Sequence, residues 1–217
     1  MISFLHRWWP RRGADPAGAV ERWLVLDVET TGLDVHHDQL LAIAAVALRV
    51  DWTERRIALQ PADSLALSLR PSRVSDKANI LVHGIGVGVQ RQGMEPAKAM
   101  RAFREWAQGA RLVAFHASFD RTLLQRYARE HLGKPLDAQW LDIAHLCTVS
   151  HPHVQARALD DWLGHFGIEC VARHEATADV MAECDLLQRI WPRVAKECGS
   201  WRAVQRYAAR HAWLGPR

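Results

Sequence analysis

An apolar run that ends in two closely spaced acids constrains the fold of this chain more than any other feature. The run covers residues 23–26, and Asp27 and Glu29 follow it with one residue between them. Side chains on a β-strand alternate between the two faces of a sheet, so residues i and i+2 point the same way. A Thr-Thr-Gly turn then ends the segment at Gly32. We therefore expect a buried strand, residues 23–29, that carries both carboxylates on one face at its end.

Two carboxylates buried side by side cost free energy unless a cation neutralises them. Oxygen ligands of this kind suit Mg²⁺ or Mn²⁺. A bare Asp-x-Glu pair is more often a strand that ends in exposed acids. The apolar residues before the pair and the glycine turn after it favour a metal site, and further acids in similar settings decide between the two interpretations.

The next part of the chain predicts an antiparallel meander. Residues 40–49 form an apolar run of strand length, and a turn follows at residues 51–54. A third strand is expected in two pieces, residues 56–59 and 65–69, and Pro71 ends it. Successive strands with short connections pair antiparallel.

Beyond Pro71 the pattern changes to helices that alternate with single strands. A strand is expected at 111–115, and a strand or short helix at 140–147. The glycine-rich segment 84–93 should be a loop. Helices are expected at residues 77–82, 97–108, 119–132, 158–166, 176–195 and 200–212. This order predicts an α/β fold, with a mixed sheet and helices on its faces.

Length and composition favour one domain. The chain has 217 residues, of which 49% are hydrophobic, and this is enough for a single core. We expect that domain over residues 20–217, after an extension over residues 1–19. Trp8 and Trp9 of the extension can stack on nucleic-acid bases, although such tryptophans more often pack on their own domain. The net charge of +4 permits a polyanionic partner without demonstrating one.

The cysteines and the hydropathy pattern indicate a cytoplasmic protein without a membrane span. None of the four cysteines forms a C-x-x-C pair, so a zinc ribbon or a thioredoxin-type site has no support. Scattered cysteines in a chain of this size predict reduced, partly buried thiols. No stretch approaches the roughly 20 apolar residues of a membrane span. The cysteines are Cys147, Cys170, Cys184 and Cys198.

Two further acids stand where predicted helices begin. Asp120 follows the strand expected at residues 111–115, and Asp179 lies in the first turns of the long helix. Helix dipoles favour acids at both places, so a purely stabilising role stays open for each. Sites in α/β sheets also lie at strand ends of this kind. If the long helix packs on the first strand, His174 in the loop before it reaches the same pocket and can take a proton from water.

Three short motifs therefore follow one another in a fixed order. They are Asp27-x-Glu29-Thr30-Thr31-Gly32-Leu33, Phe119-Asp120 and His174-x-Ala176-x-x-Asp179. Their order resembles the DEDDh (DnaQ-like) 3′–5′ exonucleases, a family that includes the proofreading epsilon subunit of bacterial DNA polymerase III. Two weaker matches are Val82-His83-Gly84-Ile85 and the stretch from Leu159 to Ile168. The resemblance covers about residues 22 to 190.

The resemblance implies a ribonuclease H-like fold, with a mixed five-stranded sheet flanked by helices. It also implies that four carboxylates hold two divalent ions, Mg²⁺ or Mn²⁺, and that His174 is the general base. Asp27 is expected to bridge the ions, Glu29 and Asp179 to complete one coordination shell, and Asp120 to support the second ion. The substrate-binding residues that it indicates are Thr30, Thr31, Leu33, His83 and Phe119.

The activity that the resemblance implies is metal-dependent removal of nucleoside 5′-monophosphates from the 3′ ends of single-stranded DNA or RNA. One alternative is a module with weak proofreading activity that docks on a DNA polymerase or another replication or repair protein. Another is an RNA-trimming exoribonuclease, because no short motif reports a contact to the 2′-OH. The chain departs from the family at His116, where Asn is common, and at Gly86. We expect His116 to be a packed histidine.

Overall fold

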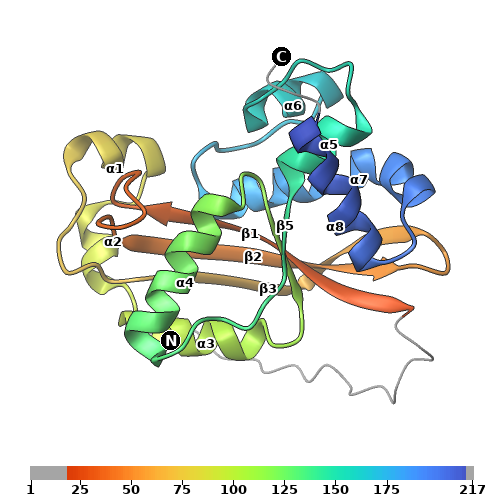
Figure 1. Cartoon of the computed structure of the whole chain (residues 1–217). Helices are drawn as coiled ribbons and strands as arrows, with labels where there is room; N and C mark the ends of the chain where they lie inside the picture. The colour runs from red at the N-terminus through yellow and green to blue at the C-terminus, as the bar shows by residue number, and fades with distance from the viewer. Residues whose placement is uncertain (1–18, 214–217) are drawn as a thin grey trace.

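The computed structural model describes residues 19–213 (Figure 1). The elements are, in chain order, β1 (Val20–Thr30), β2 (Leu40–Asp51), β3 (Arg56–Ser68), α1 (Lys77–His83), α2 (Val87–Gln92), α3 (Pro96–Trp106), β4 (Arg111–Ala114), α4 (Ser118–Leu132), β5 (Trp140–Asp142), α5 (Ile143–Ser150), α6 (Leu159–Phe166), α7 (Ala176–Glu197), α8 (Trp201–Ala209) and the 3-10 helix η2 (Arg210–Trp213). The predictions for Trp8, Trp9 and the rest of residues 1–18 concern residues outside the described range.

The strands form one mixed sheet in the order β3-β2-β1-β4-β5. Strands β1, β2 and β3 pair antiparallel, whereas β4 lies parallel to β1 and β5 parallel to β4. The predicted meander and the mixed five-stranded sheet are therefore confirmed. Between β2 and β3 the register shifts, because Val46 pairs with Ser64 while Ala47 pairs with Gln60. Pro61 lies between these pairs and has no N–H to donate to the ladder, which accounts for the bulge. The third strand, expected in two pieces, is therefore one strand with a bulge.

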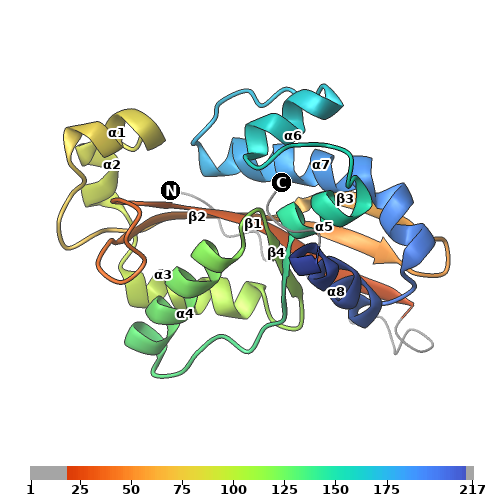
Figure 2. The same ribbon diagram turned by 45° about the horizontal axis from the view of Figure 1, so that its top comes forward.

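Helices cover both faces of the sheet in two layers. Helices α3 and α4 lie on one face, and α5 to α8 lie on the other (Figures 1 and 2). Strand β1 is buried on both sides: Trp23 and Val25 pack in the core under α7, and Leu24 and Leu26 pack in the core over α3 and α4. Asp27 continues the alternation of Trp23 and Val25, so the strand directs its carboxylate to the α7 side.

A cluster of tryptophans attaches the last two helices to the sheet. The ring of Trp23 lies edge-on to Trp52, Trp191 and Trp201, with centroid distances of 5.9, 5.6 and 4.8 Å. Aromatic pairs in this geometry stabilise a core beyond the area that they bury. The contact of Trp191 with Trp23 fixes the C-terminal half of α7, and the first turns of that helix then lie near the end of β1. Helix α7 continues through Pro192 to Glu197.

The expected loop at residues 84–93 is wrong, because residues 87–92 form helix α2. The side chain of Gln90 is buried and makes two hydrogen bonds to the backbone outside α2. Its Oε1 accepts the backbone N–H of Ser75 at 2.9 Å, and its Nε2 donates to the carbonyl of Ile85 at 2.7 Å. These tertiary hydrogen bonds stabilise a short helix that glycine content alone disfavours. The ambiguous segment at residues 140–147 contains both elements, β5 and then the start of α5.

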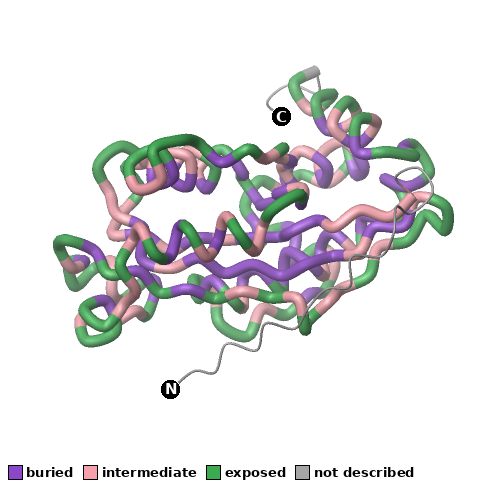
Figure 3. Tube along the Cα trace, turned by 90° about the horizontal axis from the view of Figure 1, so that it is seen from below, coloured by how far each residue is buried: buried purple, intermediate pink, exposed green. Residues whose placement is uncertain are grey.

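Burial follows the two layers, with the central strands buried and the outer helix faces exposed (Figure 3). All four cysteines are free; Cys170 is partly buried and the other three are buried. Across residues 19–213, no helix combines the length and the apolar character that crossing a bilayer requires.

Candidate active site

A cleft of about 540 Å³ lies at the C-terminal end of β1. The end of β1 and the turn after it form one wall, and α1 contributes Asn79, Val82 and His83. The end of β4, the start of α4, and α7 with the loop before it form the rest. Because β1 and β4 are parallel neighbours, their C-terminal ends meet at the same edge of the sheet, where sites of α/β folds lie.

The structure brings the four predicted acids into this one cleft. Oxygen atoms of Asp27, Glu29 and Asp179 lie within 4.8 Å of one another. Asp120 lines the same cleft from the first turn of α4. Asp27 and Glu29 come from one face of β1, and Asp179 comes from the first turn of α7. Three segments that are far apart in sequence therefore converge through the strand pairing and the packing of α7 on β1.

A fifth carboxylate, Glu183, also lines the cleft, and the sequence analysis missed it. Its side chain is only 2% exposed and accepts the backbone N–H of Phe115 at 3.3 Å. Glu183 follows Asp179 by four residues, so both lie on the same face of α7. That spacing was a usable signal, because Asp179 was already a candidate ligand.

Crowding and burial keep protons on these acids. Burial raises the pKa of Asp27 well above its ordinary value, and the negative charges of Asp120 and Glu183 raise it further. Burial, followed by the charge of Asp179, raises the pKa of Glu29 to about 8. Burial also raises the pKa of Asp120 to about 7 and the pKa of Glu183 well above its ordinary range. In each case the desolvation of the ionised form outweighs the interactions that stabilise it, and for Glu29 this holds in spite of the nearby charge of Arg173.

This donor set fits a hard divalent cation. The converging ligand atoms are all carboxylate oxygens, the donors that Mg²⁺ and Mn²⁺ prefer. A cation among them offsets the desolvation that raises the pKa values of Asp27 and Glu29. Asp27, Glu29 and Asp179 can together hold one ion. Asp120 is not part of that group of three, but it lines the same cleft.

Asp179 is held by contacts from the loop before α7. Its Oδ2 accepts the backbone N–H of His174 at 3.0 Å. Its Oδ1 accepts from the guanidinium of Arg173, which also binds Asp160 at 2.5 Å. The Sγ of Cys170 lies 3.4 Å from the same oxygen. Arg173 was not a predicted site residue, although it is the only Lys or Arg among the described residues that line the cleft.

His174 lines the rim of the cleft and its side chain is exposed. Its backbone adopts a left-handed conformation with φ of 63°, which is uncommon for a residue other than glycine. The hydrogen bond from its N–H to Asp179 supports this conformation. The structure therefore places an imidazole in the same cleft as the carboxylates, outside the group of three acids whose oxygen atoms converge.

The five predicted substrate-binding residues fall into two groups. Thr30, Leu33, His83 and Phe119 line the cleft, and Leu33 is 88% exposed. Thr31 does not line it, because its side chain stabilises the turn: Oγ1 donates to Asp38 at 2.8 Å and accepts the N–H of Gln39 at 2.9 Å.

Internal hydrogen bonds also limit what His83 can contact. Its Nδ1 accepts the backbone N–H of Ile85 at 3.0 Å, and its Nε2 lies 3.3 Å from the Oγ of Ser75. The residue is 4% exposed, and burial lowers its pKa. The ring therefore forms part of the wall of the cleft through its carbon edge.

The expectation of a packed His116 is wrong. His116 is exposed and lines the cleft, with a left-handed φ of 57°. The chain turns sharply after β4, and the backbone N–H of His116 donates to Oδ1 of Asp142 at 3.1 Å. This turn places the side chain at the surface, which the strand alternation of residues 111–115 does not predict.

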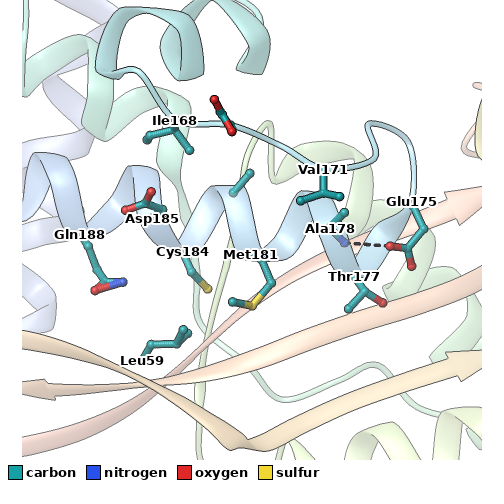
Figure 4. Close-up of a pocket in the computed structure, with 12 residues that line it drawn as sticks. Leu59, Ile168, Val171, Glu175, Thr177, Ala178, Met181, Cys184, Asp185 and Gln188 are labelled. Atoms are coloured by element: carbon teal, nitrogen blue, oxygen red, sulfur yellow. Dashed lines mark hydrogen bonds between the residues drawn. The ribbon is translucent and has the colours of Figure 1, made fainter.

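A second cavity of about 490 Å³ lies along the outer side of α7, between the loop before that helix and β3. Figure 4 shows Met181, Cys184 and Leu59 facing it, with Glu175 bonded to the N–H of Ala178 at the start of the helix. None of the predicted site residues lines this cavity. The candidate active site is therefore the cleft at the end of β1.

Comparison with known proteins matches the part of the chain that contains the candidate active site. Residues 24–187 match the RNase_T family model, whose description is "Exonuclease". A protein of Rhodobacter capsulatus described as a DNA polymerase III subunit epsilon-like protein is 32% identical over 88% of this chain and 27% of its own length. The PolC-type DNA polymerase III of Bacillus subtilis is 26% identical over 89% of this chain and 14% of its own length. The chain thus spans about a quarter or less of these curated relatives.

Solved structures confirm the fold. A structure of E. coli exonuclease I in complex with a dT13 oligonucleotide superposes with a TM-score of 0.67. The two chains are 17% identical, and the match covers 81% of this chain and 42% of exonuclease I. The expected ribonuclease H-like arrangement of the mixed five-stranded sheet is confirmed at the level of the fold.

Proposed function

The chain belongs to the RNase_T exonuclease family, and from that membership we propose that it is a metal-dependent 3′–5′ exonuclease. The reaction is hydrolysis of the last phosphodiester bond of a single strand, with release of a nucleoside 5′-monophosphate. The observation that carries the proposal is the convergence of Asp27, Glu29 and Asp179, with Asp120 in the same cleft. Cations that neutralise these acids lower the electrostatic repulsion that a polyanionic strand meets at the cleft.

The residues of the cleft divide the work of hydrolysis. Asp27, Glu29 and Asp179 hold one divalent ion and Asp120 supports a second; such a pair, when bound, supplies activation of water and stabilisation of the leaving 3′ oxygen. The exposed imidazole of His174 accepts the proton of the attacking water at a ring nitrogen. The hydrogen bond from the His174 N–H to Asp179 holds the backbone of this base next to the metal ligand.

The wall opposite α7 is suited to the 3′-terminal nucleotide. Leu33 and Phe119 offer apolar surface to a base or sugar, and Thr30 lies between Glu29 and Leu33 in sequence. Aromatic and apolar side chains bind bases with little dependence on sequence, because every base has a π-face. This wall therefore fits an enzyme that removes any terminal nucleotide.

We propose DNA as the strand and a DNA polymerase as the partner. The curated relatives support this, since both are described as DNA polymerase III proteins and both are far longer than this chain. The alternative role as an RNA-trimming enzyme has no comparable support.

Digestion of 5′-labelled DNA and of an RNA of the same sequence tests the proposal. Wild-type protein with Mn²⁺ should shorten the DNA from its 3′ end, and EDTA should abolish the ladder. Asp27→Asn removes the charge of the central ligand with little change in shape, so it should lower turnover by at least about 10³-fold. Asp137→Asn changes an exposed acid away from the cleft and should leave turnover unchanged.

Two results decide against the proposal. Equal cleavage by wild type and Asp27→Asn shows that the carboxylate cluster is not the active centre. Faster digestion of RNA than of DNA transfers the proposal to the exoribonuclease alternative.

A further inference from the structure

Three histidines gather around Asp142, just outside the cleft. Asp142 ends β5, and its Oδ1 accepts the backbone N–H of His116 at 3.1 Å. The Nε2 of His145, in the first turn of α5, lies 3.8 Å from Oδ2 of the same carboxylate. The ring of His211, in η2, stacks on that of His145 with a centroid distance of 3.3 Å and an angle of 9°. We call these three residues the histidine cluster.

The histidine cluster borders the proposed catalytic centre. His116 itself lines the cleft, next to Phe115 and close in sequence to Phe119 and Asp120. The charge of Asp142 contributes to the raised pKa of Asp120, so the carboxylate at the middle of the cluster is within electrostatic reach of that ligand. Any strand whose 3′ end reaches Asp120 therefore passes close to the cluster or ends beside it.

The cleft itself offers few cationic contacts to a nucleic-acid backbone. Five carboxylates line it, and the one arginine among its described lining residues, Arg173, is already paired with Asp160 and Asp179. On the side of β4 and β5, His116 lines the cleft and His145 lies beside Asp142. Phosphate oxygens upstream of the scissile bond need nitrogen donors such as these imidazoles, since contacts to phosphate position a strand.

The arrangement of the rings favours donation to phosphate over stacking on a base. One face of the His145 ring is covered by His211, while its side chain is still 38% exposed. The Nδ1 of His211 lies 3.0 Å from the carbonyl of Ala208, so this ring is held by its own helix turn. His211 therefore orients His145, whose ring edge stays accessible, and His116 is exposed beside it.

We propose that His116 and His145 bind the phosphates of the strand upstream of its 3′-terminal nucleotide, with His211 as a positioning residue. This inference rests on the proposed exonuclease function and extends it to the path of the substrate. Neutral imidazoles donate one N–H each, and protonated imidazoles add a positive charge.

Acidification should strengthen this contact. Burial lowers the pKa of His145, Asp142 raises it, and His211 and His116 lower it further. The ring therefore gains its charge below the usual range for histidine in the free protein, and a bound phosphate favours that charge. Each charged contact to a phosphate of single-stranded DNA contributes about 0.7 to the slope of log K against log salt concentration.

The test is the salt dependence of binding to a 5′-fluorescein oligodeoxythymidylate, measured by anisotropy in EDTA so that no turnover occurs. At pH 5.5 the double variant His116→Ala/His145→Ala should reduce the magnitude of the slope relative to wild type, by up to the value of about 1.4 that two fully charged contacts contribute. The matched control His153→Ala/His165→Ala removes two exposed histidines elsewhere and should keep the wild-type slope.

A second variant separates charge from hydrogen bonding. His116→Gln/His145→Gln keeps an N–H donor at both positions but cannot take up a proton. It should bind the oligonucleotide at pH 8 more tightly than the alanine double variant, and it should show the reduced slope at pH 5.5. Circular dichroism of each variant reports whether the fold is intact.

The outcomes separate this inference from the proposed function. If wild type digests DNA but all variants share its salt slope at pH 5.5, the phosphate contact is wrong and the exonuclease proposal stands. An equal loss of slope in the control double variant also overturns the contact, because the effect is then one of total charge. If wild type neither binds nor digests the strand, both proposals fail.

Discussion

At the scale of single residues, the site is governed by carboxylates that are close together and largely withdrawn from water. Asp120 is 4% exposed and Glu183 is 2% exposed. Such acids hold protons that a cation must displace, so metal binding and proton release are coupled. The raised pKa values of Glu29, about 8, and of Asp120, about 7, therefore predict that the divalent ion binds more weakly as the pH falls below neutrality.

The same pKa values predict the pH dependence of stability in the metal-free protein. Asp120 has a pKa of about 7 in the folded state against an ordinary value near 3.8, so between these values the folded state binds more protons than the unfolded state. Stability must then fall as the pH rises through this window. Asp120→Asn removes the titration and should raise the free energy of unfolding at pH 8 by roughly 1–4 kcal/mol more than at pH 4.

Urea unfolding in EDTA at the two pH values measures this difference. Asp137→Asn, at an exposed position, serves as the control: it keeps Asp120, so its free energy of unfolding should differ from that of wild type by the same amount at both pH values. If Asp120→Asn were instead less favourable relative to wild type at pH 8 than at pH 4, the folded state would stabilise the ionised carboxylate. That result would contradict the raised pKa of Asp120.

His174→Ala should lower the turnover number by about 10²–10⁴-fold, the usual loss for a general base. Its backbone N–H still donates to Asp179 in the variant, so the affinity for Mn²⁺ should not change. Single-turnover digestion and Mn²⁺ titration by electron paramagnetic resonance measure the two quantities separately. Unchanged turnover would show that another group accepts the proton of the water.

At the scale of elements, the site depends on how β1, α4 and α7 meet. Strand β1 presents two acids on one face, and α4 and α7 each bring one acid in their first turn. The helix dipole favours those acids at their positions, so capping and metal binding are compatible roles of the same side chains. The two interpretations that the sequence leaves open for Asp120 and Asp179 therefore do not exclude each other.

A close backbone approach at Gly93 connects α2 to the end of β3. A Cβ at this position would lie 2.4 Å from the carbonyl carbon of Leu69 and 2.6 Å from the nitrogen of Arg70. Gly93→Ala should therefore lower the free energy of unfolding by about 1–3 kcal/mol, because backbone atoms must move apart. Gly88→Ala is the matched control: a Cβ there meets open space within α2, so that variant should be more stable by about 0.5–1 kcal/mol.

Chemical denaturation of both variants tests this contrast. Equal stability of Gly93→Ala and wild type would show that the chain at residues 69 and 93 adjusts without cost. The comparison matters for the site, because β3 ends beside the segment that leads into α1 and its cleft-lining residues.

Periodicity and motif spacing predicted the sheet and most of the site, because both depend on local pattern. The alternation around Asp27 and Glu29 is a property of one strand, and it holds in the fold. What sequence reasoning missed depends on contacts between distant segments. Helix α2 is stabilised by bonds from Gln90, and the exposure of His116 follows from its contact with Asp142. Glu183 is an exception, since its spacing from Asp179 already indicated a shared helix face.

At the scale of the whole molecule, two helical layers leave one end of the sheet open for the site. Helices α3 and α4 cover one face and α5 to α8 cover the other (Figure 2). The cleft lies where β1 and β4 end, and the four predicted acids line it. Of the histidine cluster, His116 lines the cleft as well, and His145 lies beside Asp142 at the end of β5. A single strand that enters with its 3′ end first satisfies both features.

The most direct measurement compares the same single-stranded DNA labelled at its 5′ end and, separately, at its 3′-terminal nucleotide, each digested by wild-type protein with Mn²⁺. We predict that the 3′ label appears at once as a mononucleotide, while the 5′ label remains in oligonucleotides that shorten step by step. Early release of the 5′ label as a mononucleotide, internal fragments from either substrate, or digestion that continues in EDTA would contradict a metal-dependent 3′–5′ exonuclease.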